Sequence, residues 1–238
     1  MLLKKNFIDN PVSELLFDQA KKINSKIILP ENDPRINQAK DFLLNEGFNI
    51  HELDYMKIEY YTEFISKYKF TKNWTKQMML DYLDDPLHLS CTMLAKNDID
   101  CVVAGSINST SKVIRTAIRL IGLNNTSKWV SSMFLMISPN CENIYAFSDC
   151  AVIPEPDDEQ LVSIAYQTSK LYNILIDKDP KIAFLSFSTK GSASHYRVDK
   201  VVKAANNFKK KYPHICCEGE IQVDAALVPD IANKKIAN

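Results

Sequence analysis

Glycine and closely spaced cysteines are scarce in this sequence. Its 238 residues include five glycines and no G-x-G-x-x-G run, which argues against a dinucleotide-binding fingerprint. The six cysteines form no C-x-x-C pair, so the sequence gives no support to a zinc site. The four histidines are far apart along the chain and predict no metal site. We therefore expect no metal and no resident cofactor.

An excess of one charge and long apolar runs are absent as well. Twenty-nine Lys and Arg residues balance twenty-nine Asp and Glu residues, so no overall field would attract nucleic acid or an anionic membrane. No apolar run reaches the roughly 18 residues that a membrane span needs. The first residues lack the apolar core of a signal peptide. We predict a cytoplasmic protein with no nucleic-acid partner and no membrane partner.

The sequence does contain a strand, a hydroxyl-rich loop and a helix, in that order, at residues 182–208. The apolar run Ile182–Leu185 predicts a buried strand, and apolar residues with helical spacing from Val198 to Phe208 predict a helix. Proteins of the α/β class use this arrangement to present backbone N–H groups and a helix N-terminus to an anion. The candidate binding residues in the loop are Ser188, Thr189, Lys190, Gly191 and Ser192.

A second unit of the same kind lies at residues 100–121. Asp100–Ala104 predicts a strand, the following loop contains Ser109 and Thr110, and an apolar pattern with helical spacing runs on to Ile121. Arg115 falls in the first turns of that helix, where a guanidinium can reinforce the helix dipole in holding an anion. Two such units, each beside a cation, predict a ligand that carries phosphate. A binder of phosphorylated ligands of an unrelated type stays open as an alternative at this point.

The rest of the chain predicts a mixed α/β protein. A strand at 26–30, a helix at 36–45 and a strand at 48–53 form a βαβ start, which favours a parallel sheet wrapped by helices. Helices are predicted over 57–97, with a break at residues 84–86. The other predicted elements are a helix at 11–24, a hairpin with strands at 129–137 and 144–148, a helix at 159–175 capped by Asp157 or Asp158, a strand at 215–217 and a last helical run after residue 226.

Several short blocks, in their order and spacing, resemble the phosphate acetyltransferase and phosphate butyryltransferase family. The resemblance runs from about residue 26 to the end of the chain. The blocks are Leu29–Glu31 with Asp33 and Arg35, Asp85–Leu87, Val103–Thr110 with Arg115, Val130–Ser132 with Phe134, Asp149–Ala151, Glu159–Leu161, Leu185–Ser192 and Glu218–Ala226.

This resemblance implies both a fold and a reaction. The fold would be two αβα domains with mainly parallel sheets and a cleft between them, similar to the isocitrate and isopropylmalate dehydrogenase architecture. We expect these domains at residues 1–137 and 138–238. The reaction would exchange acetyl between coenzyme A and inorganic phosphate, with acetyl-CoA and phosphate as substrates and neither a metal nor an acyl-enzyme. Such chemistry needs a base for the thiol, and cations and donors for the phosphate and the oxyanion.

The resemblance also implies roles for single residues. Arg115 matches the family's cleft arginine and would anchor phosphate or another part of the substrate. Further candidates near the cleft are Ser131, Cys141, Gln222 and Asp224. Cys141 falls where some family members have a cysteine near the active cleft, and we do not expect it to act directly because the chemistry has no covalent step. We interpret Asp224 as structural rather than as the base.

The chain departs from the family pattern in three respects, the first being a turn at residues 31–33 that is one residue shorter than usual and lacks its glycine. Lys69 or Lys72 stands where the family has a second arginine, which keeps the charge but loses the bidentate fork. Family members also continue beyond Asn238 with a serine–arginine pair and an aspartate thought to be the base, so the catalytic residues stay unassigned. We expect a shortened second domain with an exposed sheet edge, and therefore a homo-oligomer or a complementing chain. The alternative is a non-catalytic relative that binds coenzyme A or a partner.

Overall fold

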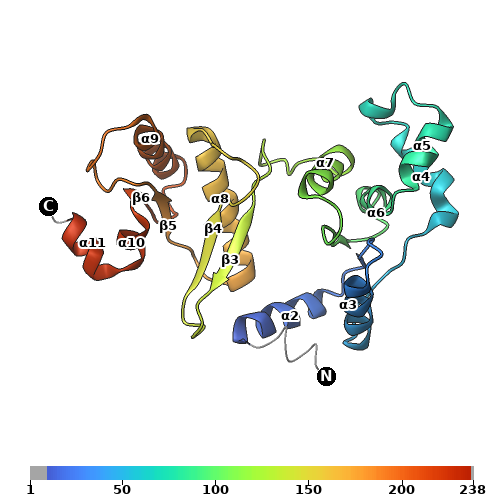
Figure 1. Ribbon diagram of the computed structural model, residues 1–238, viewed down its shortest axis with the longest axis horizontal. Coiled ribbons are helices and arrows are strands. Elements are labelled where there is room, and N and C mark those ends of the chain that lie inside the picture. Colours follow the sequence, from blue (N-terminus) through green and yellow to red (C-terminus); the bar gives the residue numbers. More distant parts are fainter. Residues whose placement is uncertain (1–9, 237–238) are drawn as a thin grey trace. The chain divides into compact units, whose positions relative to one another are not determined.

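The computed structural model describes residues 10–236 of the chain. The chain divides into two compact units after Leu123 (Figure 1), and each unit is described by itself. Both units combine helices with short strands. Among the described residues, no helix has the length and apolar character that crossing a bilayer requires.

The first unit is mainly helical. In chain order its elements are α2 (Pro11–Ile23), β1 (Ile27–Ile28), α3 (Pro34–Asn45), η1 (Tyr55–Lys57), α4 (Ile58–Ile65), η2 (Lys69–Thr71), α5 (Lys76–Leu83), α6 (Pro86–Ala95), β2 (Cys101–Val102) and α7 (Thr110–Leu120). The two strands pair in parallel, with Ile28 opposite Val102. Side-chain oxygens of Asp33, Asp85 and Ser109 accept backbone N–H groups at the starts of α3, α6 and α7, as N-cap residues do.

Helix α6 lies in the core of the first unit. Leu87 and Leu89 are buried, and α4, α5 and α7 pack against the helix. Even its hydroxyls are buried, and they donate back to the helix: Ser90 Oγ to Leu87 O (3.0 Å) and Thr92 Oγ1 to His88 O (2.8 Å). Because α6 is enclosed by these helices, its N-cap residue Asp85 is held in place by the core.

The predicted helices of this unit are present, but residues 66–75 interrupt them with one 3-10 turn that was not predicted, and one predicted strand is nearly absent. Helices occupy 58–65, 76–83 and 86–95, with the expected break at residues 84–85. The strand expected at 48–53 is reduced to a single parallel bridge between Ile27 and Ile50. Its partner β1 ends at Ile28, and Pro30 has no N–H with which to extend a ladder, so the second strand has little to pair with.

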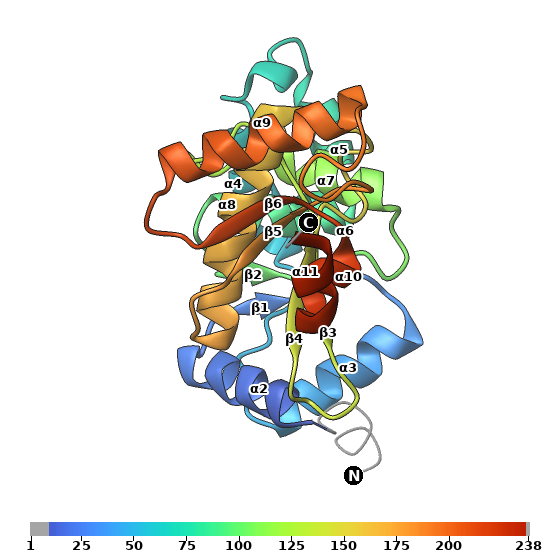
Figure 2. The same ribbon diagram turned by 90° about the vertical axis from the view of Figure 1, so that its left-hand side faces the viewer.

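The second unit contains a hairpin, a parallel strand pair and helices. In chain order its elements are β3 (Met133–Ile137), β4 (Ile144–Ser148), α8 (Asp158–Ile176), β5 (Ile182–Leu185), α9 (Tyr196–Lys211), β6 (Cys217–Ile221), α10 (Val223–Leu227) and α11 (Pro229–Ile236). Strands β3 and β4 are antiparallel, with Leu135 opposite Ala146. Strands β5 and β6 are parallel, and α9 packs across them (Figure 2).

An aromatic contact joins the parallel pair to α9. The rings of Phe184 in β5 and Phe208 in α9 meet edge to face, with centroids 5.6 Å apart. Gly219 of β6 faces this contact, because a Cβ built there would lie 2.7 Å from the Cβ of Phe184 and 3.1 Å from the Cβ of Ala205. The absence of a side chain at Gly219 lets β6 continue beneath α9 as far as Ile221. The predicted strand at 215–217 was therefore placed too early.

Other predictions for this unit are confirmed with shifted ends. The hairpin is present, although its first strand begins at Met133 rather than at Trp129. Helix α8 begins after Asp157, which forms a capping box with Gln160. The domain boundary expected after Ile137 falls between β3 and β4. Because those strands are hydrogen-bonded partners, the compact units divide before the hairpin, after Leu123.

The observed class is mixed α/β, as predicted. Within residues 10–236 the strands form three two-stranded sheets, of which β1–β2 and β5–β6 are parallel and β3–β4 is antiparallel. These sheets are smaller than a pair of full αβα domains would contain. In each parallel pair, one strand is followed by a polar loop that leads to a helix. Strand β2 leads to α7 in this way, and β5 leads to α9.

Candidate functional site

Three of the predicted site residues lie in α7 or directly before it in the first unit. Ser109 is the N-cap, and its Oγ accepts the backbone N–H of Lys112 at 3.3 Å. Thr110 is the first helical residue, and Arg115 lies about one and a half turns further along, at the middle of the helix. All three predicted residues are exposed, and the side chain of Arg115 makes no hydrogen bond or ion pair with any described residue. The arrangement presents hydroxyls, a helix N-terminus and a guanidinium to solvent.

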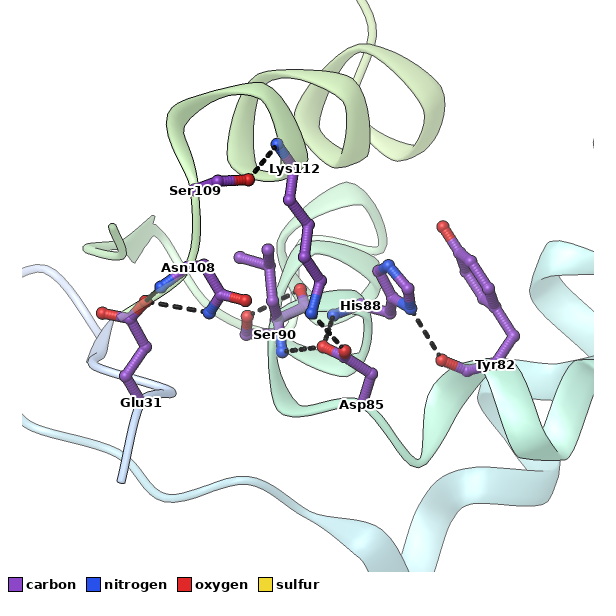
Figure 3. Close-up of polar contacts among 9 residues, drawn as sticks. Glu31, Tyr82, Asp85, His88, Ser90, Asn108, Ser109 and Lys112 are labelled. Atoms are coloured by element: carbon purple, nitrogen blue, oxygen red, sulfur yellow. Dashed lines mark hydrogen bonds and ion pairs between the residues drawn. The ribbon is translucent and has the colours of Figure 1, made fainter. Parts of the chain in front are cut away.

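The charge of Lys112, at the start of α7, is balanced by a carboxylate from the start of α6 (Figure 3). Helix α7 contains no acidic residue, and Lys112 stands in its first turn, where the helix dipole disfavours a cation. Its Nζ lies 2.6 Å from Oδ2 of Asp85. Asp85 also caps α6 by accepting the backbone N–H of Leu87 at 2.9 Å. Burial acts to raise the pKa of Asp85, but the hydrogen bond from Lys112 and the neighbouring His88 bring that pKa below its ordinary value.

His88 has a structural place beside this ion pair. Its ring stacks on Tyr82 with centroids 3.8 Å apart, and its Nδ1 donates to the carbonyl oxygen of Tyr82 at 2.9 Å (Figure 3). Burial lowers the pKa of His88, although its bond to the Tyr82 carbonyl opposes that shift. The imidazole therefore ties the end of α5 to the start of α6 in its neutral form.

The loop between β2 and α7 is closed around a carboxylate from another part of the chain (Figure 3). Glu31, which follows β1, accepts the four consecutive backbone N–H groups of residues 105–108, of which Figure 3 shows the one from Asn108. Its side chain also accepts from Nδ2 of Asn108 at 2.8 Å. Burial acts to raise the pKa of Glu31, but these hydrogen bonds, led by those from Asn108, lower it to about 2. The carboxylate is ionised at neutral pH, so the predicted anion loop already holds an anion.

The hydroxyls of the second predicted loop are bonded to one another. Ser188 is buried, its Oγ lies 3.2 Å from Oγ of Ser192, and it accepts the backbone N–H of Ala193. Thr189 Oγ1 donates to Oε1 of Gln222 at 3.2 Å and accepts the Gln222 backbone N–H at 3.0 Å. The structure therefore brings Gln222 to the loop, although 33 residues separate it from Thr189.

Lys190 and Gly191 turn the same loop back toward β6. Both have left-handed backbone angles, with φ of 51° and 85°. The Nζ of Lys190 lies 2.6 Å from Oε1 of Glu218, and the N–H of Gly191 donates to the Glu220 carboxylate at 3.2 Å. Burial acts to raise the pKa of Glu218, but hydrogen bonds from Lys190, from the Gly219 backbone and from Lys209 lower it to about 2. The loop lysine is thus paired within the chain.

Asp224 is also paired. Both its carboxylate oxygens contact the Nζ of Lys235, at 2.8 and 3.0 Å, and the same Nζ lies 2.9 Å from Oε1 of Gln222. The hydrogen bond from Lys235 is the main cause that holds the pKa of Asp224 below its ordinary value. These contacts join α10 to α11 and suit a structural carboxylate.

The structure does not bring Ser131 and Cys141 together. Ser131 precedes β3, whereas Cys141 lies in the turn at the other end of that strand, with φ of 59°. Close to Ser131, the hydroxyl of Ser132 donates to Asp149. Asp149 also accepts the N–H groups of residues 151–153, so it organises the segment after β4.

No cluster among residues 10–236 suits a metal ion. The described part of the chain contains no group of three or more His, Cys, Asp and Glu residues that could hold one.

Comparison with known proteins identifies the family. Residues 45–238 match the family model described as Phosphate acetyl/butaryl transferase. The chain belongs to this family. Over 220 residues it is 35% identical to the phosphate acetyltransferase of Acetivibrio thermocellus, covering 90% of this chain and 66% of that protein. The chain thus spans slightly less than two thirds of the length of this relative.

Solved structures of the family have the same fold. A phosphotransacetylase from Streptococcus pyogenes matches with a TM-score of 0.80 at 29% identity, covering 93% of this chain and 77% of that one. The EutD phosphotransacetylase from Staphylococcus aureus matches with a TM-score of 0.76 at 28% identity, covering 95% and 78%. These matches and the family model agree with the family that the sequence blocks resemble.

Three charged residues of this family member did not appear among the predicted site residues. Glu31 and Asp85 lie in the sequence blocks, and Asp85 directly before Pro86 is a local signal for a helix N-cap. Nothing in the local sequence shows that Glu31 binds the 105–108 loop or that Asp85 pairs with Lys112. Lys112 carries a local signal, because a lysine in the first turn of a helix without acidic residues needs a distant carboxylate. The sequence cannot say that this carboxylate is Asp85.

Proposed function

We propose that this chain is a phosphate acetyltransferase, which converts acetyl-CoA and phosphate into acetyl phosphate and coenzyme A. The supporting observation is its family membership over residues 45–238, together with 35% identity to a phosphate acetyltransferase. The unpaired Arg115 on a helix without acidic residues agrees with an anionic substrate.

Phosphate binds at the start of α7 in this proposal. Arg115 offers a planar fork that matches two phosphate oxygens. Ser109 and Thr110 supply hydroxyls, and the helix dipole favours the negative charge. Lys112 is held by Asp85 and contributes charge rather than direct contact. The proposed site thus combines a helix N-terminus with the unpaired guanidinium of the same helix.

The transfer step needs no covalent enzyme intermediate. In the direction of acetyl-CoA synthesis, the thiolate sulfur of coenzyme A attacks the carbonyl carbon of acetyl phosphate. The carbon–oxygen bond to phosphate then breaks, and phosphate leaves with the bonding electron pair. Cations around the phosphate stabilise this leaving group and the oxyanion that precedes it. We assign no residue as the base. The carboxylate considered for this role, Asp224, is paired with Lys235 and is interpreted as structural.

The loop of the second unit is proposed separately as a set of candidate ligand contacts. Ser188 and Thr189 hold its shape, whereas Ser192 is exposed and Lys190 and Gly191 form its tip. Gln222 belongs to the same set through Thr189. We include Ser131 and Cys141 as peripheral candidates, and we expect Cys141→Ser to keep activity.

We also propose the family's two αβα domains, a cytoplasmic location and assembly with a second copy or a complementing chain. Apolar side chains on one face of β3 support assembly, since Phe134 and Met136 are 59% and 50% exposed. Light scattering of the purified protein tests the proposed assembly directly. A monodisperse monomer would contradict it.

The activity is tested by following free thiol while purified protein converts acetyl-CoA and phosphate. The proposal predicts phosphate-dependent release of coenzyme A above the rate of denatured protein. Isothermal titration with coenzyme A on the same sample separates the alternative. Binding without turnover would contradict the transferase proposal and favour a non-catalytic, coenzyme A-binding relative.

A further inference from the structure

The loop before α7 is shaped by an anion that belongs to the chain itself. Glu31 Oε2 accepts the N–H of Ser106 at 2.7 Å, and Oε1 accepts those of Gly105, Ile107 and Asn108 at 3.1, 3.2 and 2.9 Å. Glu31 is only 4% exposed. Successive N–H groups that converge on one point form a nest, which is an anion-binding shape. Here the anion is a carboxylate 74 or more residues away in the sequence.

Strand pairing brings Glu31 to this position. Strand β1 runs parallel to β2, and the N–H of Val103 donates to Ile28 O at 3.0 Å beyond the last paired residues. The chain after β1 therefore runs beside the chain after β2. Glu31 is three residues past β1, and the nest begins at Gly105, three residues past β2. The carboxylate and the nest reach the same end of the strand pair.

Because the nest is filled, substrate phosphate cannot use these four N–H groups. The groups left for phosphate lie beyond the loop, at Ser109, Thr110 and Arg115. Their positions depend on the loop, since Asn108 donates to Glu31 through both its backbone and its side chain and the next residue caps α7. On its other side, α7 is held by the contact between Lys112 and Asp85.

We propose that Glu31 is a positioning residue, a built-in anion that fixes the 105–108 loop and thereby sets the place of the phosphate-binding start of α7. This inference rests on the proposed function for its effect on substrate. Its structural part, that a carboxylate is the required filler of the nest, stands apart from activity.

The second unit offers an internal comparison. Glu220 is also only 4% exposed, and its carboxylate accepts the N–H of Gly191 in the loop after β5. Only this one loop N–H meets it, whereas four meet Glu31. Removing the Glu220 carboxylate should therefore disturb its loop less than removing that of Glu31.

The test combines Glu31→Ala with chemical rescue by formate. Removal of the side chain leaves four converging N–H groups without their carboxylate and loosens the loop before α7, so we expect the KM for phosphate to rise about ten-fold. The KM for acetyl-CoA and kcat should change by less than about threefold, because the acetyl-transfer step is not touched. Formate, a small carboxylate, should lower the KM for phosphate again in a saturable way, and chloride at equal ionic strength should not.

Hydrogen exchange gives a readout that does not need activity. The amides of residues 105–108 should exchange about ten-fold faster in Glu31→Ala than in the unmodified protein, and formate should slow them again. Glu31→Gln keeps the size of the side chain and serves as a second variant in case Glu31→Ala does not fold. It should weaken phosphate binding without responding to formate, because its amide still fills the nest.

Asp33→Ala is the matched control. Its carboxylate lies on the same segment but caps α3 and pairs with Arg35 at 2.8 Å, and it accepts none of the N–H groups of residues 105–108. It should leave the KM for phosphate unchanged and show no formate effect. An unchanged KM for phosphate in Glu31→Ala, or exchange that formate does not slow, would overturn the inference. If the unmodified protein has no turnover, the proposed function fails, and the formate-dependent exchange still decides the role of Glu31 in the loop.

Discussion

Lys112 Nζ lies 2.6 Å from Asp85 Oδ2, so a single contact joins the start of α7 to the start of α6. Asp85 also accepts the backbone N–H groups of Leu87 and His88. One carboxylate thus caps one helix and balances a cation at the positive end of another. Because α6 is buried, this contact relates the exposed site to the core of the first unit.

Substitution of Asp85 should separate its two roles. Asp85→Asn keeps an oxygen that can cap α6 but removes the charge, and we expect a loss of about 1 kcal/mol in the free energy of unfolding because the ion pair is partly exposed. Asp85→Ala also removes the cap and should lose about 2 kcal/mol in all. Urea unfolding measures both values. The exposed pair of Glu59 and Lys76 serves as control, and Glu59→Gln should not change stability measurably. Equal stability of Asp85→Asn and the unmodified protein would contradict a stabilising ion pair.

Stability should depend on acid through Glu218. Its pKa in the folded chain is about 2, below the ordinary 4.5, so the unfolded chain takes up the proton first. The contribution of this carboxylate is complete above about pH 4.5 and is lost as the pH falls toward 2. Glu218→Gln should therefore be less stable than the unmodified protein at pH 7, and the difference should shrink with acid.

Urea unfolding at several pH values between 7 and 2 measures this convergence. Lys190→Met removes the first hydrogen-bond partner of Glu218 and should make stability less dependent on pH in the same range. A constant difference between Glu218→Gln and the unmodified protein at all pH values would show that the carboxylate does not titrate as described.

Gly219 should be intolerant of any side chain. A Cβ there would stand 2.7 Å from the Cβ of Phe184, so Gly219→Ala must push β6 away from α9 and should cost about 1–3 kcal/mol of the free energy of unfolding. Gly219→Val should cost more. Gly122→Ala is a useful comparison. An alanine at its φ of 92° would be strained, but no atom lies within 4 Å of a Cβ built there, so this variant measures backbone strain without a packing clash. A Gly219→Ala protein as stable as the unmodified one would contradict the packing of β6 beneath α9.

Local signals in the sequence predicted the helices well. Asp157 before an apolar helical pattern predicted the start of α8, and the break near Pro86 separated α5 from α6. These features depend on residues within one or two turns of each other. The strand after Phe48 failed for the opposite reason, since strand length depends on a partner, and that partner ends at Ile28.

The partners of the two anion loops, residues 105–108 and 188–192, could not be predicted from nearby residues. The composition of these loops predicted turns that suit an anion, and the family resemblance pointed to Arg115; both stay predictions as ligand sites. Neither revealed that Glu31 fills one nest and that Glu220 reaches the other loop, because those partners lie 74–77 and 29 residues away. Such contacts follow from strand pairing, which periodicity alone does not define.

The central claim is that Arg115 binds the phosphate of the substrate, and steady-state kinetics of Arg115 variants with phosphate as the varied substrate test it most directly. We expect Arg115→Ala to raise the KM for phosphate by about ten-fold or more, because a charge-assisted bidentate contact is lost. Arg115→Lys should recover part of this loss. Arg119, on the same helix with its guanidinium over the Phe70 ring at 5.9 Å, provides the control, and Arg119→Ala should leave that KM unchanged. An unchanged KM for phosphate in Arg115→Ala would contradict the account.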